Sequence, residues 1–121
     1  MSWTKRQFIE QAFDEIGLAA YVFDLQPEQL QSALRKLDSM MATWNALGIK
    51  VGYPMPSTPE GSSLNQETNV PDASNEAVYQ NLTIKIAPSY GKLVPVELKV
   101  SALTAYNALI ARFMKIEQIQ F

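Results

Sequence analysis

Residues 27–48 read PEQLQSALRKLDSMMATWNALG and show the clearest helical pattern in the chain. Proline suits the first position of a helix, where its missing N–H is not needed, and glycine is a common helix stop. Between them, apolar residues recur at steps of four and three, which is the spacing of one helical face: Leu30, Leu34, Leu37, Met41, Trp44 and Leu47. We interpret this stripe as core. The polar residues between its members are expected to face away: Gln31, Arg35, Lys36 and Asp38.

Upstream, residues 5–16 predict another helix. Thr4 is its expected N-cap, with Gln7 as capping-box partner, and Gly17 is its expected stop. Its apolar residues share one face: Phe8, Ile9, Ala12, Phe13 and Ile16. The connector 18–26 is apolar for a loop and is expected to pack on the core.

Two more helices are expected downstream. One starts near Asp72 or Ser74 and stops at Pro88, and the other starts at Pro95. The apolar face of the first comprises Val78, Tyr79, Leu82 and Ile86, and that of the second comprises Ala102, Leu103, Tyr106, Leu109, Ile110 and Phe113. The predicted fold class is therefore all-α, a four-helix domain spanning residues 1–121.

Two segments do not fit this helical pattern. Residues 48–72 form a long central loop rich in proline, glycine and serine, in which Ile49, Val51 and Tyr53 alternate as in an extended strip. Both a flexible surface loop and an ordered contact arm are compatible with this composition. The apolar C-terminal tail, residues 114–121, is compatible with an extension of the last helix or with a strand that needs a partner.

The amino-acid composition excludes several classes of function. The chain has 121 residues, a length typical of one domain, and contains no cysteine and no histidine. Disulfides, thiol nucleophiles and the usual zinc, copper and haem ligands are therefore missing, and we expect no cofactor and no metal site. The net charge of −2 does not match the basic footprint of a nucleic-acid clamp. Neither a membrane span nor a secretory signal is expected.

The sequence gives little support to a catalytic site or to a DNA-binding motif. Without histidine, a serine nucleophile lacks its usual base, although a serine–lysine pair stays open. A cell-wall hydrolase would need two of Glu10, Asp14 and Glu15 to face a groove, whereas a solvated helix surface is the simpler interpretation. A DNA-binding helix-turn-helix is disfavoured because the connector 18–26 is too long. No catalytic residue is assigned.

The sequence resembles a known family. Residues 37–44 read Leu-Asp-x-Met-Met-Ala-x-Trp, followed by Gly48-Ile49; residues 12–17 read AFDEIG; and residues 75–82 and 86–91 read NEAVYQNL and IAPSYG. In order and spacing these segments resemble the head-to-tail adaptor proteins of tailed phages, especially the packaged-DNA-stabilising tail accessory factor of short-tailed phages.

That resemblance implies a non-enzymatic helical subunit that assembles as a ring, commonly twelve-fold, beneath the portal after DNA packaging. The ring closes the head and offers a platform for the tail. The implied partners are further copies of the chain, the portal protein and a tail or nozzle protein, with weak contact to DNA in the channel. The implied location is the head–tail junction of the virion, after assembly in the host cytoplasm.

Two sets of residues are candidates for these contacts. The portal contact is expected at the C-terminal tail, with Phe113, Ile116, Ile119 and Phe121. Contacts with a neighbouring subunit or the tail are expected from the loop, with Ile49, Val51, Tyr53 and Met55. The resemblance also implies a longer polar C-terminal extension. Either the portal contact is shorter here, or the apolar tail ending at Phe121 supplies it by adding a strand or inserting a helix.

Overall fold

The computed structural model describes residues 2–17, 27–49, 51–57 and 61–119, with side chains as far as Phe113. In chain order the elements are α1 (Lys5–Glu15), α2 (Pro27–Ala46), the 3₁₀ turn η3 (Asp72–Ser74), α3 (Asn75–Ile86), the 3₁₀ turn η4 (Ala87–Tyr90) and α4 (Val96–Ile119). The described residues contain no β-sheet, only an isolated antiparallel bridge between Thr4 and Glu67. The predicted all-α fold with four helices is confirmed. The connector 18–26 lies outside the described residues.

Helix α1 begins with the predicted capping box. The Thr4 Oγ1 accepts a hydrogen bond from the Gln7 amide at 3.2 Å, and the Gln7 Oε1 accepts one from the Thr4 amide at 2.8 Å. The helix ends at Glu15. Gly17 follows with a φ of +78°, a backbone conformation that residues with a Cβ rarely adopt. The predicted apolar face is buried throughout: Phe8, Ile9, Ala12, Phe13 and Ile16.

Helix α2 buries most of its predicted stripe and widens it. Leu34, Leu37, Met41 and Trp44 are buried together with Ala33 and Met40. Leu47 departs from the prediction, because α2 ends at Ala46 and Gly48, at a φ of +97°, turns the chain away. The Leu47 side chain is therefore 57% exposed.

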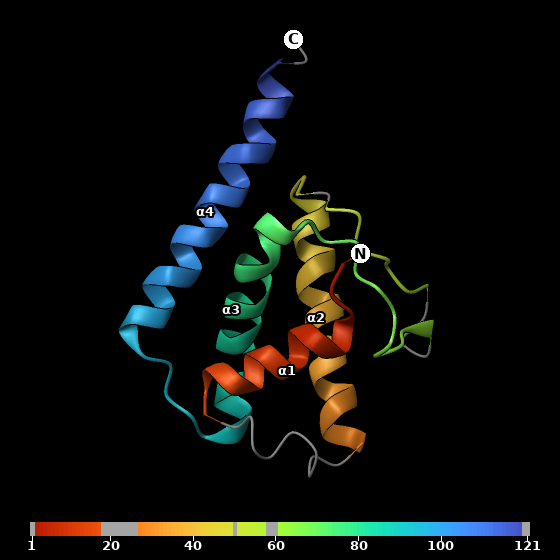
Figure 1. Ribbon diagram of the computed structural model, residues 1–121, viewed down its shortest axis with the longest axis vertical. Coiled ribbons are helices and arrows are strands. Elements are labelled where there is room, and N and C mark those ends of the chain that lie inside the picture. The colour runs from red at the N-terminus through yellow and green to blue at the C-terminus, as the bar shows by residue number, and fades with distance from the viewer. Residues whose placement is uncertain (1, 18–26, 50, 58–60, 120–121) are drawn as a thin grey trace.

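Helix α3 is the centre of the molecule, and α1, α2 and α4 all pack against it (Figure 1). Its predicted apolar residues Val78, Leu82 and Ile86 are buried, but so are polar side chains on its other faces. Buried Thr83 donates to the carbonyls of Tyr79 at 2.8 Å and of α1 residue Ala12 at 3.3 Å. Since α3 is covered on several sides, its weak amphipathic pattern follows from its position.

Pro88 ends α3 as predicted, but the chain stays helical beyond it. Proline lacks an N–H and fits the first turn of a helix, so Pro88 is accommodated in the first turn of η4, which begins at Ala87. Gly91 then takes a left-handed conformation with a φ of +65°, and its amide donates to the Pro88 carbonyl at 3.2 Å. The predicted helix is thus followed directly by a 3₁₀ turn.

Helix α4 packs on α3 through buried Leu98, Ala102 and Leu109, and Asn81 of α3 donates to the Ala102 carbonyl at 3.2 Å. Leu103, which the spacing predicts to be buried, is 59% exposed, because it lies about 100–140° around the helix from these three residues. The predicted residues Tyr106, Ile110 and Phe113 are half-buried against the core.

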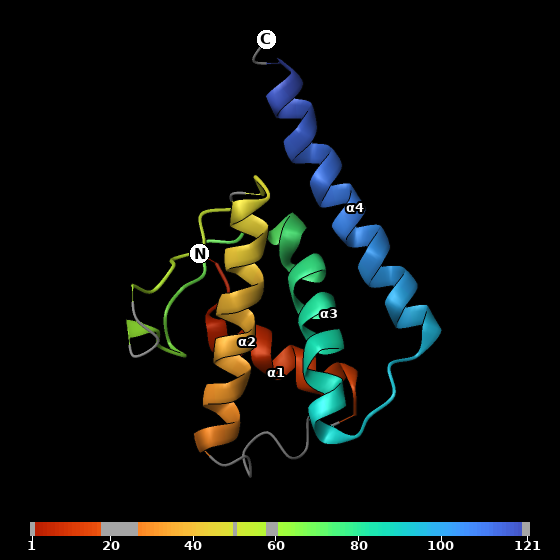
Figure 2. The same ribbon diagram turned by 180° about the vertical axis from the view of Figure 1, so that it is seen from behind.

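The C-terminal end of α4 projects from the body. With 24 residues against 12 in α3, α4 is about twice as long, about 36 Å at 1.5 Å per residue. Figures 1 and 2 show its C-terminal end extending past the other helices. The tail is helical through Ile119, so the strand alternative is wrong for residues 114–119.

Replacing the N-cap of α1 tests the local part of this fold. We expect Thr4→Ala to lower the free energy of unfolding by about 1 kcal/mol, because the amide of Gln7 loses its acceptor. Urea denaturation measures this change. Thr104→Ala, at an exposed interior position of α4, is the matched control and is expected to change stability by less than about 0.5 kcal/mol. Equal effects of the two substitutions would contradict the assigned role of Thr4.

Candidate functional site

The central loop is held against the start of α1. The first amides of a helix have no partner within it. Here the loop supplies the acceptors, because Lys5 donates to the Gln66 carbonyl at 3.0 Å and Arg6 to the Leu64 carbonyl at 2.9 Å. The end of the loop is held to the N-terminal segment in the same way, since the Thr68 amide donates to the Trp3 carbonyl at 3.0 Å. This part of the loop is therefore an ordered element of the fold.

The Lys5 side chain fastens the loop to α2 and is completely buried. Its ammonium lies 3.0 Å from the Asp38 carboxylate, donates to the Ser62 hydroxyl at 2.8 Å and the Pro54 carbonyl at 3.4 Å, and sits 4.7 Å from the centre of the Tyr53 ring. A buried charge is tolerated only when it is paired and hydrogen-bonded. We call Lys5, Asp38, Tyr53 and Ser62 the Lys5 clamp.

Tyr53 completes the clamp as a hydrogen-bond donor to the Asp38 carboxylate. Burial raises the pKa of Tyr53 far above its ordinary value, and the hydrogen bond to Asp38 and the charge of Asp38 raise it further. The phenol therefore stays neutral at physiological pH and acts as a fixed donor. This excludes a general-base role for Tyr53.

The sequence interpretation missed the clamp. Asp38 was expected to face away from the body, and this is wrong because its carboxylate lies against buried Lys5. One signal was present, since Lys5 stands at the first position of α1, where the helix dipole disfavours a cation. A lysine at such a position points to a nearby carboxylate, but nothing in the spacing of residues 5 and 38 says which one.

The structure separates the four loop residues predicted to make contacts. Ile49, Val51 and Tyr53 are buried in the core of their own subunit, while Met55 is 39% exposed. Gly52, between the buried residues, has a φ of +88° and lies against Asn69 of the returning segment. Ile49, Val51 and Tyr53 therefore stabilise their own subunit, and Met55 is the one of the four whose side chain is exposed to a partner.

The predicted portal residues lie along the projecting end of α4. Phe113 is half-buried and packs against the core. Ile116 and Ile119 belong to the last turns of the helix, and Phe121 lies outside the described residues. The structure thus brings Phe113, Ile116 and Ile119 onto one element, remote in sequence and space from the Lys5 clamp (Figure 1).

Large apolar side chains are exposed in two places among the described residues. One group comprises Leu93, at 94% exposure, and three residues in the first turns of α4, Val96, Val100 and Leu103. We call these four residues the α4 stripe. The other comprises Leu47, directly after α2, and Met55, on the loop beside α2. Contiguous exposed apolar side chains mark contact surfaces in proteins.

A groove of about 420 Å³ lies beside Met55, on the surface of α2. We call it the α2 groove. Its walls come from α2 and from the loop segment that follows Pro54: Arg35, Asp38, Ser39, Ala42, Asn45, Met55, Pro56 and Ser57. Because Lys5 binds both Asp38 and the Pro54 carbonyl, the Lys5 clamp sets the distance between the two walls.

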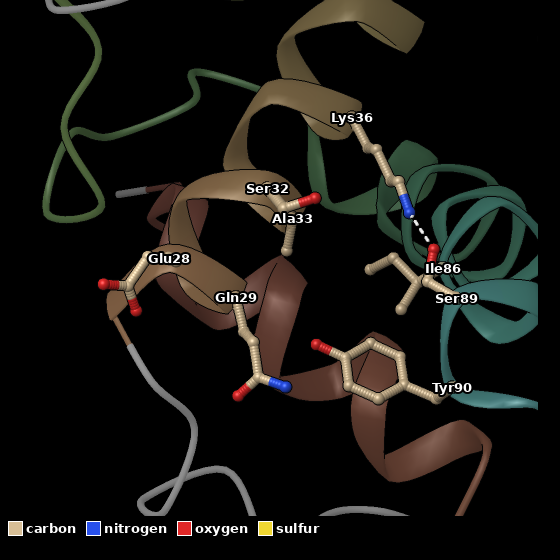
Figure 3. A pocket seen from close by; sticks show the side chains of 8 residues that line it. All are labelled: Glu28, Gln29, Ser32, Ala33, Lys36, Ile86, Ser89 and Tyr90. Carbon is tan, nitrogen blue, oxygen red and sulfur yellow. Dashed lines mark hydrogen bonds between the residues drawn. The ribbon is translucent and has the colours of Figure 1, made fainter.

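A second cavity, of about 260 Å³, separates α2 from η4 (Figure 3). Lys36 donates a hydrogen bond to the Ser89 hydroxyl, and the remaining lining residues are Glu28, Gln29, Ser32, Ala33, Ile86 and Tyr90. A catalytic serine–lysine pair needs a lysine shielded from water. Ser89 is exposed and Lys36 only half-buried, so this geometry does not support such a pair.

The carboxylates proposed for a hydrolase do not converge on a cleft. Asp14 and Glu15 accept hydrogen bonds from the Gln11 side chain, at 3.4 and 3.2 Å, along the outer surface of α1. Within the described residues no cluster of three potential metal ligands occurs. Among them, too, no helix has the length and apolar character that crossing a bilayer requires.

The fold and these surfaces define a small all-α protein whose clearest surface features are apolar, as in subunits of larger assemblies. A protein-family model described as P22 tail accessory factor matches residues 1–120, and the chain belongs to that family. Membership gives the protein a structural role in the tail or head–tail region of a phage and an association with the virion. The resemblance found in the sequence is confirmed at this level.

Removing the carboxylate of the clamp tests its role. We expect Asp38→Ala to lower the free energy of unfolding by about 3–5 kcal/mol, because a buried ammonium is left without a counter-charge. Urea denaturation measures the loss. The double variant Lys5→Met/Asp38→Leu removes both charges and should recover most of it.

Asp14→Ala removes an exposed carboxylate from α1 and serves as control, with an expected change below about 0.5 kcal/mol. A clamp that contributes little would show itself as equal stability of the Asp38→Ala and Asp14→Ala variants.

Proposed function

We propose that this protein is a head-to-tail adaptor that assembles as a ring beneath the portal, closes the DNA-filled head and forms the platform to which the tail attaches. The proposal goes beyond the family-level role and includes the portal and a tail or nozzle protein as partners. It places the protein at the head–tail junction after assembly in the host cytoplasm, with residues 1–121 acting as one domain.

The observation that carries this proposal is the projection of α4 from an otherwise complete body. The core around α3 uses α4 as far as Phe113, because Leu98, Ala102 and Leu109 are buried and Phe113 is half-buried against it. Its last turns, with Ile116 and Ile119, extend past the other helices (Figure 2). A helix that projects in this way can insert between the subunits of a larger ring, a common mode of helix recognition.

The adaptor role also accounts for the surfaces of the subunit. A closed ring requires each copy to present two different, mutually complementary surfaces. The described residues include two separate exposed apolar groups, the α4 stripe and the pair Leu47 and Met55. Their number and placement support an assembled state, and we propose a ring of twelve copies, the number implied by the family resemblance.

We propose a non-enzymatic role for the same reasons. Membership in a family of tail accessory factors is a structural assignment. The candidate acids Glu10, Asp14 and Glu15 lie on the surface of α1, and the Lys36–Ser89 pair is open to solvent. With a net charge of −2, contact with DNA in the channel is expected to be weak and independent of sequence.

Charging the end of α4 tests the portal contact. We expect Ile116→Asp/Ile119→Asp to reduce binding to purified portal rings at least about tenfold, because two buried isoleucines each contribute about 1.5–3 kcal/mol. Co-sedimentation with the portal measures binding, and circular dichroism verifies the fold. Gln118→Asp/Gln120→Asp adds the same charge to the same segment and should bind like the unmodified chain.

The outcomes separate two claims. If the unmodified chain does not bind portal rings, the adaptor function is wrong. If it binds and the isoleucine variant binds equally well, the function stands and the portal contact lies elsewhere.

A further inference from the structure

The α4 stripe occupies a face of α4 that the subunit itself leaves uncovered. Val96, Val100 and Leu103 follow the i, i+4, i+7 spacing that aligns side chains along one side of a helix. Their exposures are 69, 58 and 59%. Counted around the helix at 3.6 residues per turn, Val100 lies nearly opposite buried Ala102 and Leu109, and Val96 and Leu103 lie about 100–140° from them. The start of α4 is therefore apolar on two sides, and only one side is used within the subunit.

The α2 groove is the hollow counterpart of this ridge. Its floor consists of small α2 side chains, Ser39 and Ala42, and one wall consists of Met55 and Pro56. Small residues let a second helix approach closely, and most of the exposed lining is apolar. The two walls of the groove are held in place, because buried Lys5 donates hydrogen bonds both to Asp38 on α2 and to the Pro54 carbonyl in the loop.

Ridge and groove lie on opposite flanks of the molecule. Figures 1 and 2 both show α4 at one side and the loop that follows α2 at the other, with α3 and α2 between them. Surfaces on opposite flanks cannot meet within one subunit. They are arranged for a head-to-tail contact, in which each copy offers its ridge to one neighbour and its groove to the other.

The charges beside the two surfaces agree with this pairing. Glu97 and Lys99 flank the α4 stripe on its two sides, Arg35 lines the α2 groove, and all three are exposed. Among the described residues, the Asp38 carboxylate of the groove forms an ion pair with Lys5 of its own subunit. The charged group that the groove presents to a neighbour is therefore the Arg35 guanidinium. Glu97 of one copy can therefore pair with Arg35 of the next.

From these observations we propose that the occupant of the α2 groove is the α4 stripe of a second copy of this chain. This inference rests on the proposed ring and specifies its subunit interface. It also divides α4 between two tasks: the first turns join neighbouring subunits, and the projecting end contacts the portal.

Cysteine cross-linking tests the pairing directly, because the chain contains no cysteine. Val100→Cys on the stripe and Ala42→Cys on the groove floor are both at exposed positions. The double variant is bound to purified portal rings and treated with a short bis-maleimide. Denaturing electrophoresis should then show a ladder of cross-linked species that extends to the full ring. In an equimolar mixture of the two single variants each copy carries one cysteine. The largest cross-linked species should then be a dimer, formed where a Val100→Cys copy lies next to an Ala42→Cys copy.

Two controls make the result decisive. Each single variant alone should remain uncross-linked, and Val100→Cys combined with Asp14→Cys, an exposed position on α1, should give no ladder. Dimers from Val100→Cys alone would show that α4 packs on α4 and would overturn the pairing. A portal-bound double variant that stays monomeric would overturn it as well, while leaving the adaptor function intact. Failure of the unmodified chain to bind portal rings would remove both proposals.

Discussion

The buried ion pair of Lys5 with Asp38 is the interaction on which the rest of the architecture depends. It joins the start of α1, the middle of α2 and the central loop, three segments far apart in the chain. Burying a lysine is costly, and the cost is offset here by a carboxylate, a hydroxyl, a carbonyl and an aromatic ring around one ammonium. Such a demanding set of partners can be satisfied in one arrangement of the loop, and so it specifies that arrangement.

That specificity explains how a proline-rich loop can carry function. Most loops of this length lack the apolar contacts needed to hold one conformation. In this protein Ile49, Val51 and Tyr53 insert into the core, and the carbonyls of Leu64 and Gln66 cap the first amides of α1. Met55 and Pro56 are thereby held beside α2 as the wall of a groove. An ordered loop and a rigid helix together make a surface that a partner can recognise without reorganising it.

The central position of α3 has a complementary consequence. Since α3 is surrounded by α1, α2 and α4, the core is complete before α4 reaches its end. The remaining surface of α4 is free for contacts outside the subunit, which fits a member of a phage tail accessory factor family. One face of α4 thus completes the core, whereas the exposed face of its first turns is not covered within the subunit.

The helices, the Thr4 capping box, the core stripe of α2 and the family could be predicted from the amino-acid sequence, because these depend on residues three or four apart or on order along the chain. The pairing of Asp38 with Lys5, 33 positions away, and the outward position of Leu103 follow from the folded arrangement. Helical periodicity says which side chains share a face, whereas which face is covered depends on packing between distant segments. The α2 groove, whose walls come from a helix and a loop, is therefore a property of the folded chain alone.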